Sequence, residues 1–156
     1  MRSITGRGNR GTILVVDDDP SVVVVIKAIL TTASYRVLLA VEGDDAIRLA
    51  RQKHIHIDVA LLDVRLPGIH GTQLAGELLS IRPNLRVLFM SGFLDDEIIR
   101  IKLLDGNAGF LSKPFKSEGL LQAVRQAMDA LPADGSRTAP FGASRALVSC
   151  AAGHAR

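Results

Sequence analysis

Several short apolar runs in this sequence are each followed by side chains that could do chemistry. Asp17, Asp18 and Asp19 follow one run, and later runs are followed by Asp63, Ser91 and Lys113. Each residue alone has a plain structural explanation, because an aspartate after a strand is often a helix cap or a solvated loop residue. Together they are harder to explain in that way, since clustered carboxylates repel one another and destabilise a fold unless a cation lies among them.

The residue types indicate which chemistry such a cluster would support. Ligands that are all oxygen atoms favour a hard cation such as Mg²⁺, which keeps water molecules and accepts a phosphate oxygen. Lys113 would offer a point charge, and Ser91 a hydrogen-bond donor, to the remaining oxygens of a phosphate. The set therefore predicts a site for phosphoryl transfer.

These side chains can meet only if the elements that carry them form one sheet. Short aliphatic runs alternate with longer amphipathic segments, a pattern typical of a parallel sheet covered by helices on both faces. The expected strands are 13–16, 36–40, 59–62, 87–90 and 109–111, and the expected helices are 21–33, 44–52, 72–81, 95–104 and 117–131. The ligand crevice of such a sheet lies at the carboxyl ends of its strands. The pattern thus predicts an α/β fold of the flavodoxin-like, doubly wound type, with five parallel strands.

Composition and charge exclude several other classes of protein. Of the 156 residues 47% are apolar, which excludes a wholly disordered chain. Only one residue, Cys150, is a cysteine, which excludes a disulfide scaffold and favours a cytoplasmic protein. The formal net charge is +3, but residues 1–12 and 132–156 hold six of the 19 basic side chains and one of the 16 acidic ones. Residues 13–131 are therefore net acidic, with 13 basic and 15 acidic side chains, so the basic balance does not indicate a nucleic-acid-binding domain.

The same composition divides the chain into three parts. Residues 1–11 are predicted to be a flexible segment, 12–131 the folded domain, and 132–156, rich in Pro, Ala, Gly, Ser and Arg, a disordered tail. The longest aliphatic run, Val22–Ile26, is far shorter than the roughly 20 residues that a membrane span needs. We therefore expect no membrane segment.

Four motifs give the sequence a family resemblance. ILVVDDDP at 13–20, DVALLDVRLPGIHG at 58–71, VLFMSG at 87–92 and GFLSKPF at 109–115 resemble the receiver domain of two-component response regulators. The resemblance covers roughly residues 12–131, and the SGF and KPF forms are most similar to receivers of hybrid histidine kinases. Because four separate motifs coincide in order and spacing, the resemblance is specific.

The resemblance implies roles for particular residues. Asp63 would be the phosphoacceptor, and Mg²⁺ would be held by Asp17, Asp18, Asp63 and the backbone carbonyl of Arg65. Lys113, which is expected to precede a cis proline and point at Asp63, would assist the transfer, and Ser91 and Phe110 would be the switch residues.

It also implies partners. The phosphoryl group would come from a sensor histidine kinase or a histidine phosphotransfer protein. A downstream protein would bind the face made by helix 95–104, strand 109–111 and helix 117–131. The domain would be a monomer or weak dimer and would catalyse only its own phosphotransfer and autodephosphorylation, so it would not be an enzyme in the usual sense.

Three departures from the family pattern carry expectations of their own. His70 stands where the family commonly has an acidic residue, which predicts weaker capping of the helix that follows. The bulky Phe93 would shield Asp63 from attacking water, which is a hypothesis about the lifetime of the phosphorylated state. Phe110 in place of tyrosine removes a hydroxyl that a partner could contact.

Two other functions fit parts of the same sequence. Asp17-x-Asp19-x-Ser21 matches the signature of haloacid-dehalogenase-like phosphatases, with Asp17 as nucleophile, but no acidic pair follows Lys113 to complete that site. A receiver-fold interaction module that is not phosphorylated is the second alternative, and the complete set of acidic, hydroxyl and lysine residues argues against it.

Only 25 residues follow Leu131, too few for an output domain, so we expect a stand-alone receiver, although a piece of a hybrid kinase would look the same.

His54 and His56 have the spacing of a metal-binding pair, but a connecting loop is the favoured interpretation.

Overall fold

The computed structural model describes residues 9–92 and 108–129, and these form nine helices and strands. The strands are β1 (Thr12–Val16), β2 (Arg36–Ala40), β3 (Val59–Asp63), β4 (Arg86–Ser91) and β5 (Ala108–Ser112). The helices are α1 (Pro20–Thr32), α2 (Gly43–Ala50), α3 (Gly71–Ile81) and α5 (Ser117–Asp129). The expected helix 95–104, Phe93 and Cys150 lie outside the described residues.

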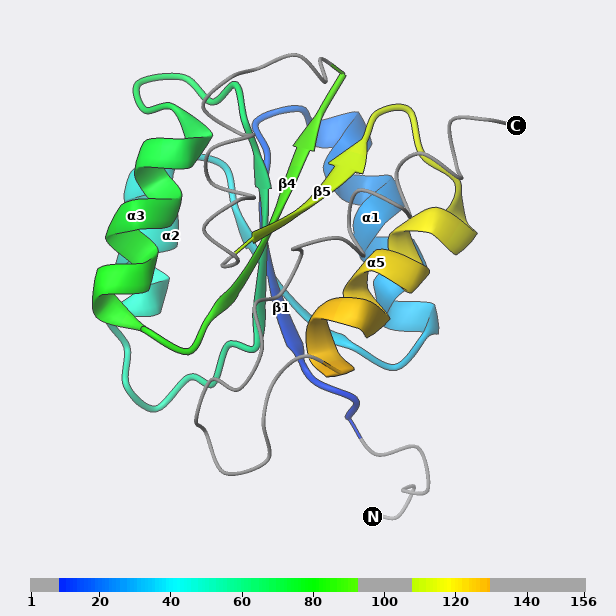
Figure 1. Ribbon diagram of the computed structural model, residues 1–156, viewed down its shortest axis with the longest axis horizontal. Helices are drawn as coiled ribbons and strands as arrows, with labels where there is room; N and C mark the ends of the chain where they lie inside the picture. Colours follow the sequence, from blue (N-terminus) through cyan, green and yellow to red (C-terminus); the bar gives the residue numbers. More distant parts are fainter. Residues whose placement is uncertain (1–8, 93–107, 130–156) are drawn as a thin grey trace.

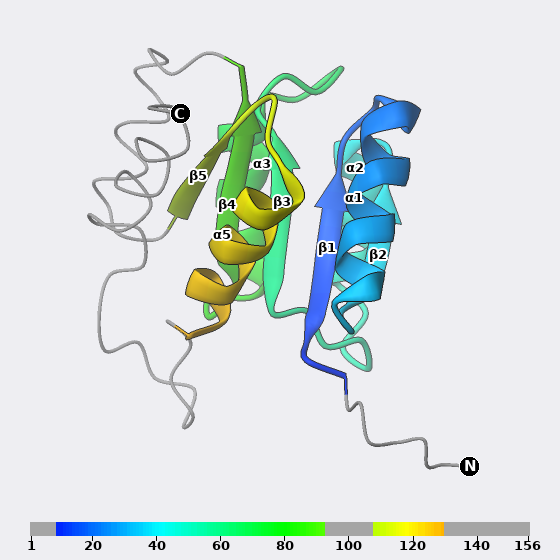
Figure 2. The same cartoon turned by 90° about the vertical axis from the view of Figure 1, so that its right-hand side faces the viewer.

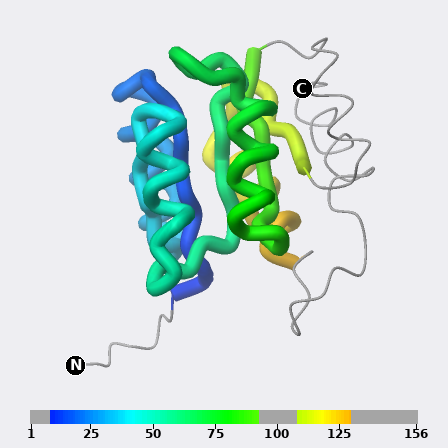
Figure 3. The backbone as a smooth tube through the Cα atoms, turned by 90° about the vertical axis from the view of Figure 1, so that its left-hand side faces the viewer, coloured from blue at the N-terminus to red at the C-terminus, as the bar shows by residue number. Residues whose placement is uncertain are grey.

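All five strands belong to one parallel sheet with the order β2-β1-β3-β4-β5. Helices α2 and α3 cover one face and α1 and α5 cover the other, as Figures 1 and 2 show from two sides. Figure 3 shows α2 and α3 lying side by side on their face of the sheet. This arrangement confirms the predicted fold class, and the order places β1 and β3 next to each other at the centre.

Two apolar cores lie on opposite faces of the sheet. Alternating residues of β1 divide between them: Leu14 and Val16 pack toward α2 and α3, while Ile13 and Val15 pack toward α1 and α5. All four side chains are fully buried. This burial on both faces explains why the strands read as continuous apolar runs rather than as alternating ones.

Helix α1 forms although it contains four consecutive valines, which favour strands. Pro20 stands at its first position, where the missing N–H costs nothing, and the Asp19 side chain caps it by accepting a hydrogen bond from the Ser21 N–H at 2.9 Å. The start signals therefore outweigh the local strand propensity.

His70 caps helix α3. Its Nδ1 accepts from the Thr72 N–H at 3.3 Å and lies 2.8 Å from the Thr72 hydroxyl oxygen. The bond to the N–H is longer than the 2.9 Å of the Asp19 cap on α1. The histidine thus performs the capping role that an acidic residue would otherwise fill.

Arg82, which follows α3, joins that helix to α2. Its guanidinium donates to the carbonyl oxygens of Ala50 and Gln52, both at 2.8 Å. These carbonyls belong to the last residue of α2 and its extension, where a helix leaves acceptors without partners of its own.

In the part of the chain that the structure describes, no helix has the length and apolar character needed to cross a membrane.

Candidate functional site

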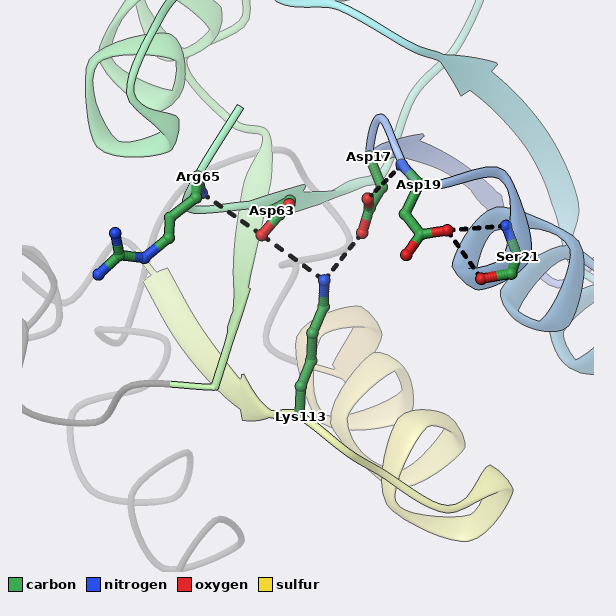
Figure 4. A network of polar contacts seen from close by, with 6 residues as sticks. All are labelled: Asp17, Asp19, Ser21, Asp63, Arg65 and Lys113. Atoms are coloured by element: carbon green, nitrogen blue, oxygen red, sulfur yellow. Dashed lines mark hydrogen bonds and ion pairs between the residues drawn. The ribbon is translucent and has the colours of Figure 1, made fainter. Parts of the chain in front are cut away.

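The side chains that the sequence predicts to form the site converge at the carboxyl edge of the sheet. Asp17 directly follows β1, Asp63 is the last residue of β3, Ser91 ends β4, and Lys113 follows β5. Since Val16 pairs with Leu62 across the two central strands, the next residues, Asp17 and Asp63, lie side by side. Figure 4 shows the polar contacts around them.

Three carboxylates form a group that could hold a metal ion. Asp17, Asp18 and Asp63 each place one oxygen within 4.8 Å of the others. Asp17 is buried, Asp63 is at the border of burial, and Asp18 is exposed, so the group opens to solvent on one side. This all-oxygen donor set, partly buried and partly open, fits a hard divalent cation that keeps some of its water.

Lys113 reaches into this acidic group. Its Nζ donates to Asp17 Oδ2 at 3.0 Å and lies 3.6 Å from Asp63 Oδ1 (Figure 4). The other oxygen of Asp17 accepts from the Asp19 N–H at 2.9 Å. The lysine therefore points at both carboxylates and is closer to Asp17, whereas the sequence suggested Asp63 as its target. The Lys113–Pro114 peptide is cis, as expected.

The environment of Asp63 raises the pKa of its carboxyl group above the ordinary value of 3.8. Burial is the largest cause, and the neighbouring charge of Asp17 adds to it. Lys113 and the Arg65 N–H, which lies 3.4 Å from Asp63 Oδ1, act in the opposite direction. A cation placed among the carboxylates would relieve the repulsion that remains.

The loop after Asp63 is held closely by its own backbone. The Gly71 N–H donates to the Val64 carbonyl at 2.8 Å, and Arg65 and His70 form an isolated antiparallel bridge. A Cβ on Gly71 would lie 2.5 Å from the Asp63 carbonyl oxygen, so no side chain fits there. This glycine lets the start of α3 pack against the backbone of Asp63.

The two expected switch residues lie in different surroundings. Ser91 is buried at the edge beside the acidic group, and its carbonyl accepts from the Lys113 N–H at 2.9 Å. Phe110 is buried in the core between the sheet and helices α2 and α3. The structure thus places Ser91 at the site and Phe110 in the core beneath it.

Asp19 and His56 take structural roles. The Asp19 Oδ1 accepts from both the N–H and the hydroxyl of Ser21, at 2.9 and 2.7 Å, and these hydrogen bonds lower the pKa of Asp19. His56 Nε2 lies 2.6 Å from Asp58 Oδ1, just before the start of β3. Among the described residues, the acidic group at the carboxyl edge is the only cluster suited to a metal.

The family model described as "Response regulator receiver domain" matches residues 13–125. The chain is 28% identical over 129 residues to the sensor kinase CckA of Brucella abortus, covering 83% of this chain and 14% of that protein. It is 33% identical over 116 residues to the transcriptional regulatory protein ZraR of Salmonella typhimurium, covering 74% of this chain and 26% of that protein. The chain therefore spans only a minor part of these relatives.

Solved structures give the same result. A CheY-like response regulator receiver domain protein from Methanospirillum hungatei matches with a TM-score of 0.70 and 26% identity, over 76% of this chain and 94% of that one. The receiver domain of the hybrid histidine kinase CckA matches with a TM-score of 0.64 and 30% identity, over 76% of this chain and 99% of that one. With its parallel sheet, its acidic group and its lysine at one edge, this chain belongs to the family of response regulator receiver domains of two-component signalling.

Proposed function

We propose that this domain accepts a phosphoryl group on Asp63 from a phosphohistidine of a sensor histidine kinase or a histidine phosphotransfer protein. The observation that carries the proposal is the position of Asp63 at the carboxyl edge of the sheet, with its Oδ1 3.6 Å from the Lys113 ammonium and 3.4 Å from the Arg65 nitrogen. The carboxylate is thus held where positive charge and a backbone donor face an incoming phosphate.

The transfer needs little beyond positioning and charge stabilisation. A carboxylate oxygen of Asp63 attacks the phosphorus, and the new O–P bond forms as the P–N bond to the imidazole breaks. The bonding electron pair leaves with the imidazole nitrogen. Lys113 and the Ser91 hydroxyl stabilise the oxygens of the transferred group.

The acidic group suits the cation that such a transfer requires. Asp17, Asp18, Asp63 and the backbone carbonyl of Arg65 are the proposed ligands of Mg²⁺. When bound, Mg²⁺ supplies positive charge that offsets the negative charge of the phosphate oxygens and of the three carboxylates. Asp17 serves two roles here, because it also fixes Lys113 through the 3.0 Å contact.

The acyl phosphate adds negative charge next to Ser91 and Lys113, and we propose that this charge changes the surface that partners bind. The surface comprises β5, α5 and residues 95–104, of which the last lie outside the described part. Phe110, buried below Ser91, is the proposed second switch residue.

We propose that residues 12–131 form the folded domain. We also propose that the protein lies in the cytoplasm, a reducing compartment that suits a chain with a single cysteine. The domain would act only on its own phosphoryl group, through transfer and autodephosphorylation, and not as an enzyme on other substrates.

Phosphorylation with acetyl phosphate and Mg²⁺, followed by mass spectrometry of the trapped acyl phosphate, tests the proposal. We expect the label at Asp63 in the wild-type protein and no label in Asp63→Asn. Asp44→Asn is the matched control, because it removes an exposed carboxylate of α2 that is not part of the acidic group, and it should be labelled like the wild type.

Two outcomes would reject the proposal in different ways. A label at Asp17 that survives in Asp63→Asn would favour the phosphatase-like reaction. No label in the wild-type protein, under conditions in which a known receiver is labelled, would favour an interaction module that is not phosphorylated.

A further inference from the structure

The outer side of strand β2 is a free sheet edge within the described part of the chain. β2 is the first strand of the sheet and pairs only with β1 among the described strands. The Arg36 N–H donates to the Gly11 carbonyl, and the Ala40 carbonyl accepts from the Asp17 N–H. The even-numbered residues of β2 therefore direct their backbone hydrogen bonds toward β1. In a parallel ladder the residues between them, Val37 and Leu39, direct their N–H and C=O groups outward.

The middle of this edge, residues 37–41, lacks the features that usually prevent edge strands from pairing. Such edges commonly carry a lysine, a proline, a bulge or an inward-pointing charge. Residues 37–41 read VLLAV, with no charge, proline or glycine. Leu39 is 40% exposed and Val41 is 56% exposed. Among the residues that the structure describes, the edge thus offers both unpaired backbone groups and apolar side chains to another strand.

The charges at the two ends of this segment are opposite in sign. Arg36 begins the strand and Glu42 follows just beyond its end, and both side chains are exposed. If two copies pair antiparallel through β2, Arg36 of each copy lies beside Glu42 of the other, and the apolar middle segments face each other. A parallel pair would instead place like charges together.

From this self-complementary pattern we propose that two copies of this chain associate through their β2 edges. The two β2 strands run antiparallel about a two-fold axis near Leu39. Their pairing joins the sheets of the two copies into one continuous sheet. The contact is isologous, so it closes at a dimer and does not propagate into a filament. None of Asp63, Ser91 and Lys113 lies on β2, so the contact does not include the proposed phosphorylation site.

Charge reversal tests the proposal with the full-length chain. Sedimentation equilibrium should show a reversible monomer–dimer equilibrium for the wild-type protein. Arg36→Glu and Glu42→Arg should each weaken the dimer about ten-fold or more at low salt, because each replaces two attractive cross-strand contacts with two repulsive ones. Glu77→Arg on α3 is a matched control that makes the same kind of charge change at an exposed site away from β2.

Recombining the charges gives the sharper result. An equimolar mixture of Arg36→Glu and Glu42→Arg should form a heterodimer close to wild-type affinity, since every cross-strand pair is then opposite in sign. The double variant should also regain wild-type affinity. Circular dichroism of each variant checks that the fold is kept.

Three outcomes would overturn the proposal. The wild-type chain could remain monomeric at all concentrations, which would leave the edge to a strand from a different protein. The two β2 variants could dimerise as well as the control. Finally, the mixture could fail to restore association although each variant is folded.

Discussion

Lys113 Nζ lies 3.0 Å from the buried carboxylate of Asp17 and 3.6 Å from that of Asp63. The Asp17 side chain is fully buried, whereas that of Lys113 is 24% exposed. Removal of the lysine would leave the Asp17 carboxylate as a buried charge, held by the hydrogen bond that it accepts from the Asp19 N–H. This ion pair therefore supports the fold as well as the reaction.

We expect Lys113→Met to lower the free energy of unfolding of the metal-free protein by about 1–3 kcal/mol, the range for a hydrogen bond to a charged group left unmade. The same variant should lose acetyl phosphate labelling at Asp63. Denaturant unfolding measures the first effect and mass spectrometry the second. Lys116→Met, at an exposed position three residues later, is the control. A Lys113→Met variant as stable as Lys116→Met would contradict the argument.

The raised pKa of Asp63 makes stability depend on pH. The folded state binds the Asp63 proton more tightly than the unfolded state does, because burial and Asp17 disfavour the charge. This contribution to stability is fully present below the unfolded pKa near 3.8 and is lost as the pH rises through the raised folded pKa. In metal-free buffer, Asp63→Asn should therefore be more stable than the wild type at neutral pH.

The difference between the two proteins should disappear when the pH falls below the unfolded pKa. Parallel denaturant titrations of the wild type and Asp63→Asn across this pH range measure it. A wild-type protein that is the more stable of the two at neutral pH without metal would show that Asp63 is not a source of repulsion.

Mg²⁺ should stabilise the wild-type protein against heat. A ligand that binds only the folded state adds about 2.7 kcal/mol at 100 times its dissociation constant. Asp18→Asn should reduce this gain in melting temperature, because Asp18 supplies one of the three clustered oxygens. Asp44→Asn should keep it. An equal gain in the wild type and in Asp18→Asn would remove Asp18 from the ligand set.

Much of the fold and the site could be predicted because parallel strands place their carboxyl ends at one edge. The predicted strand 36–40 has the bounds of β2, and the other four strands each extend beyond their predicted ends. The added residues include Thr12, Asp63, Ser91 and Ser112, which are polar and so fall outside an apolar run. Backbone pairing continues through such residues because it does not depend on the side chain.

Contacts between distant side chains could not be predicted. Lys113 lies closer to Asp17 than to Asp63. This difference depends on how far β1, β3 and β5 each extend at the edge of the sheet, and a local sequence pattern does not determine that. Arg82 reaches the carbonyls of Ala50 and Gln52 across about 30 residues of sequence. The His70 cap was also unexpected in its chemistry, since a ring nitrogen takes the place of a carboxylate oxygen.

Truncation tests the proposed limits of the domain. Residues 132–156 lie beyond the segment 13–125 that matches the receiver family, and they carry three arginines and one aspartate. We expect a chain ending at residue 131 to be labelled at Asp63 by acetyl phosphate at the wild-type rate. Labelling that falls several-fold, in a truncated chain whose circular dichroism is unchanged, would show that the tail takes part in the reaction.

Gly71 and Gly76 provide a matched pair within α3. A Cβ at Gly71 would meet the Asp63 carbonyl oxygen at 2.5 Å and the Val64 Cα at 2.8 Å, both of them backbone atoms, whereas a Cβ at Gly76 meets nothing within 4 Å. Gly76→Ala should raise stability by about 0.5–1 kcal/mol, because alanine loses less backbone entropy in a helix. Gly71→Ala should instead lower stability by about 1–3 kcal/mol, the usual range for overpacking.

Gly71→Ala should also slow phosphorylation, since the backbone that moves is that of the phosphoacceptor itself. Denaturant unfolding and the rate of acetyl phosphate labelling together separate the two effects: Gly76→Ala should change only stability, and Gly71→Ala both. If Gly71→Ala were labelled at the wild-type rate while folded, the close approach of α3 would not position Asp63, and its role would be limited to packing.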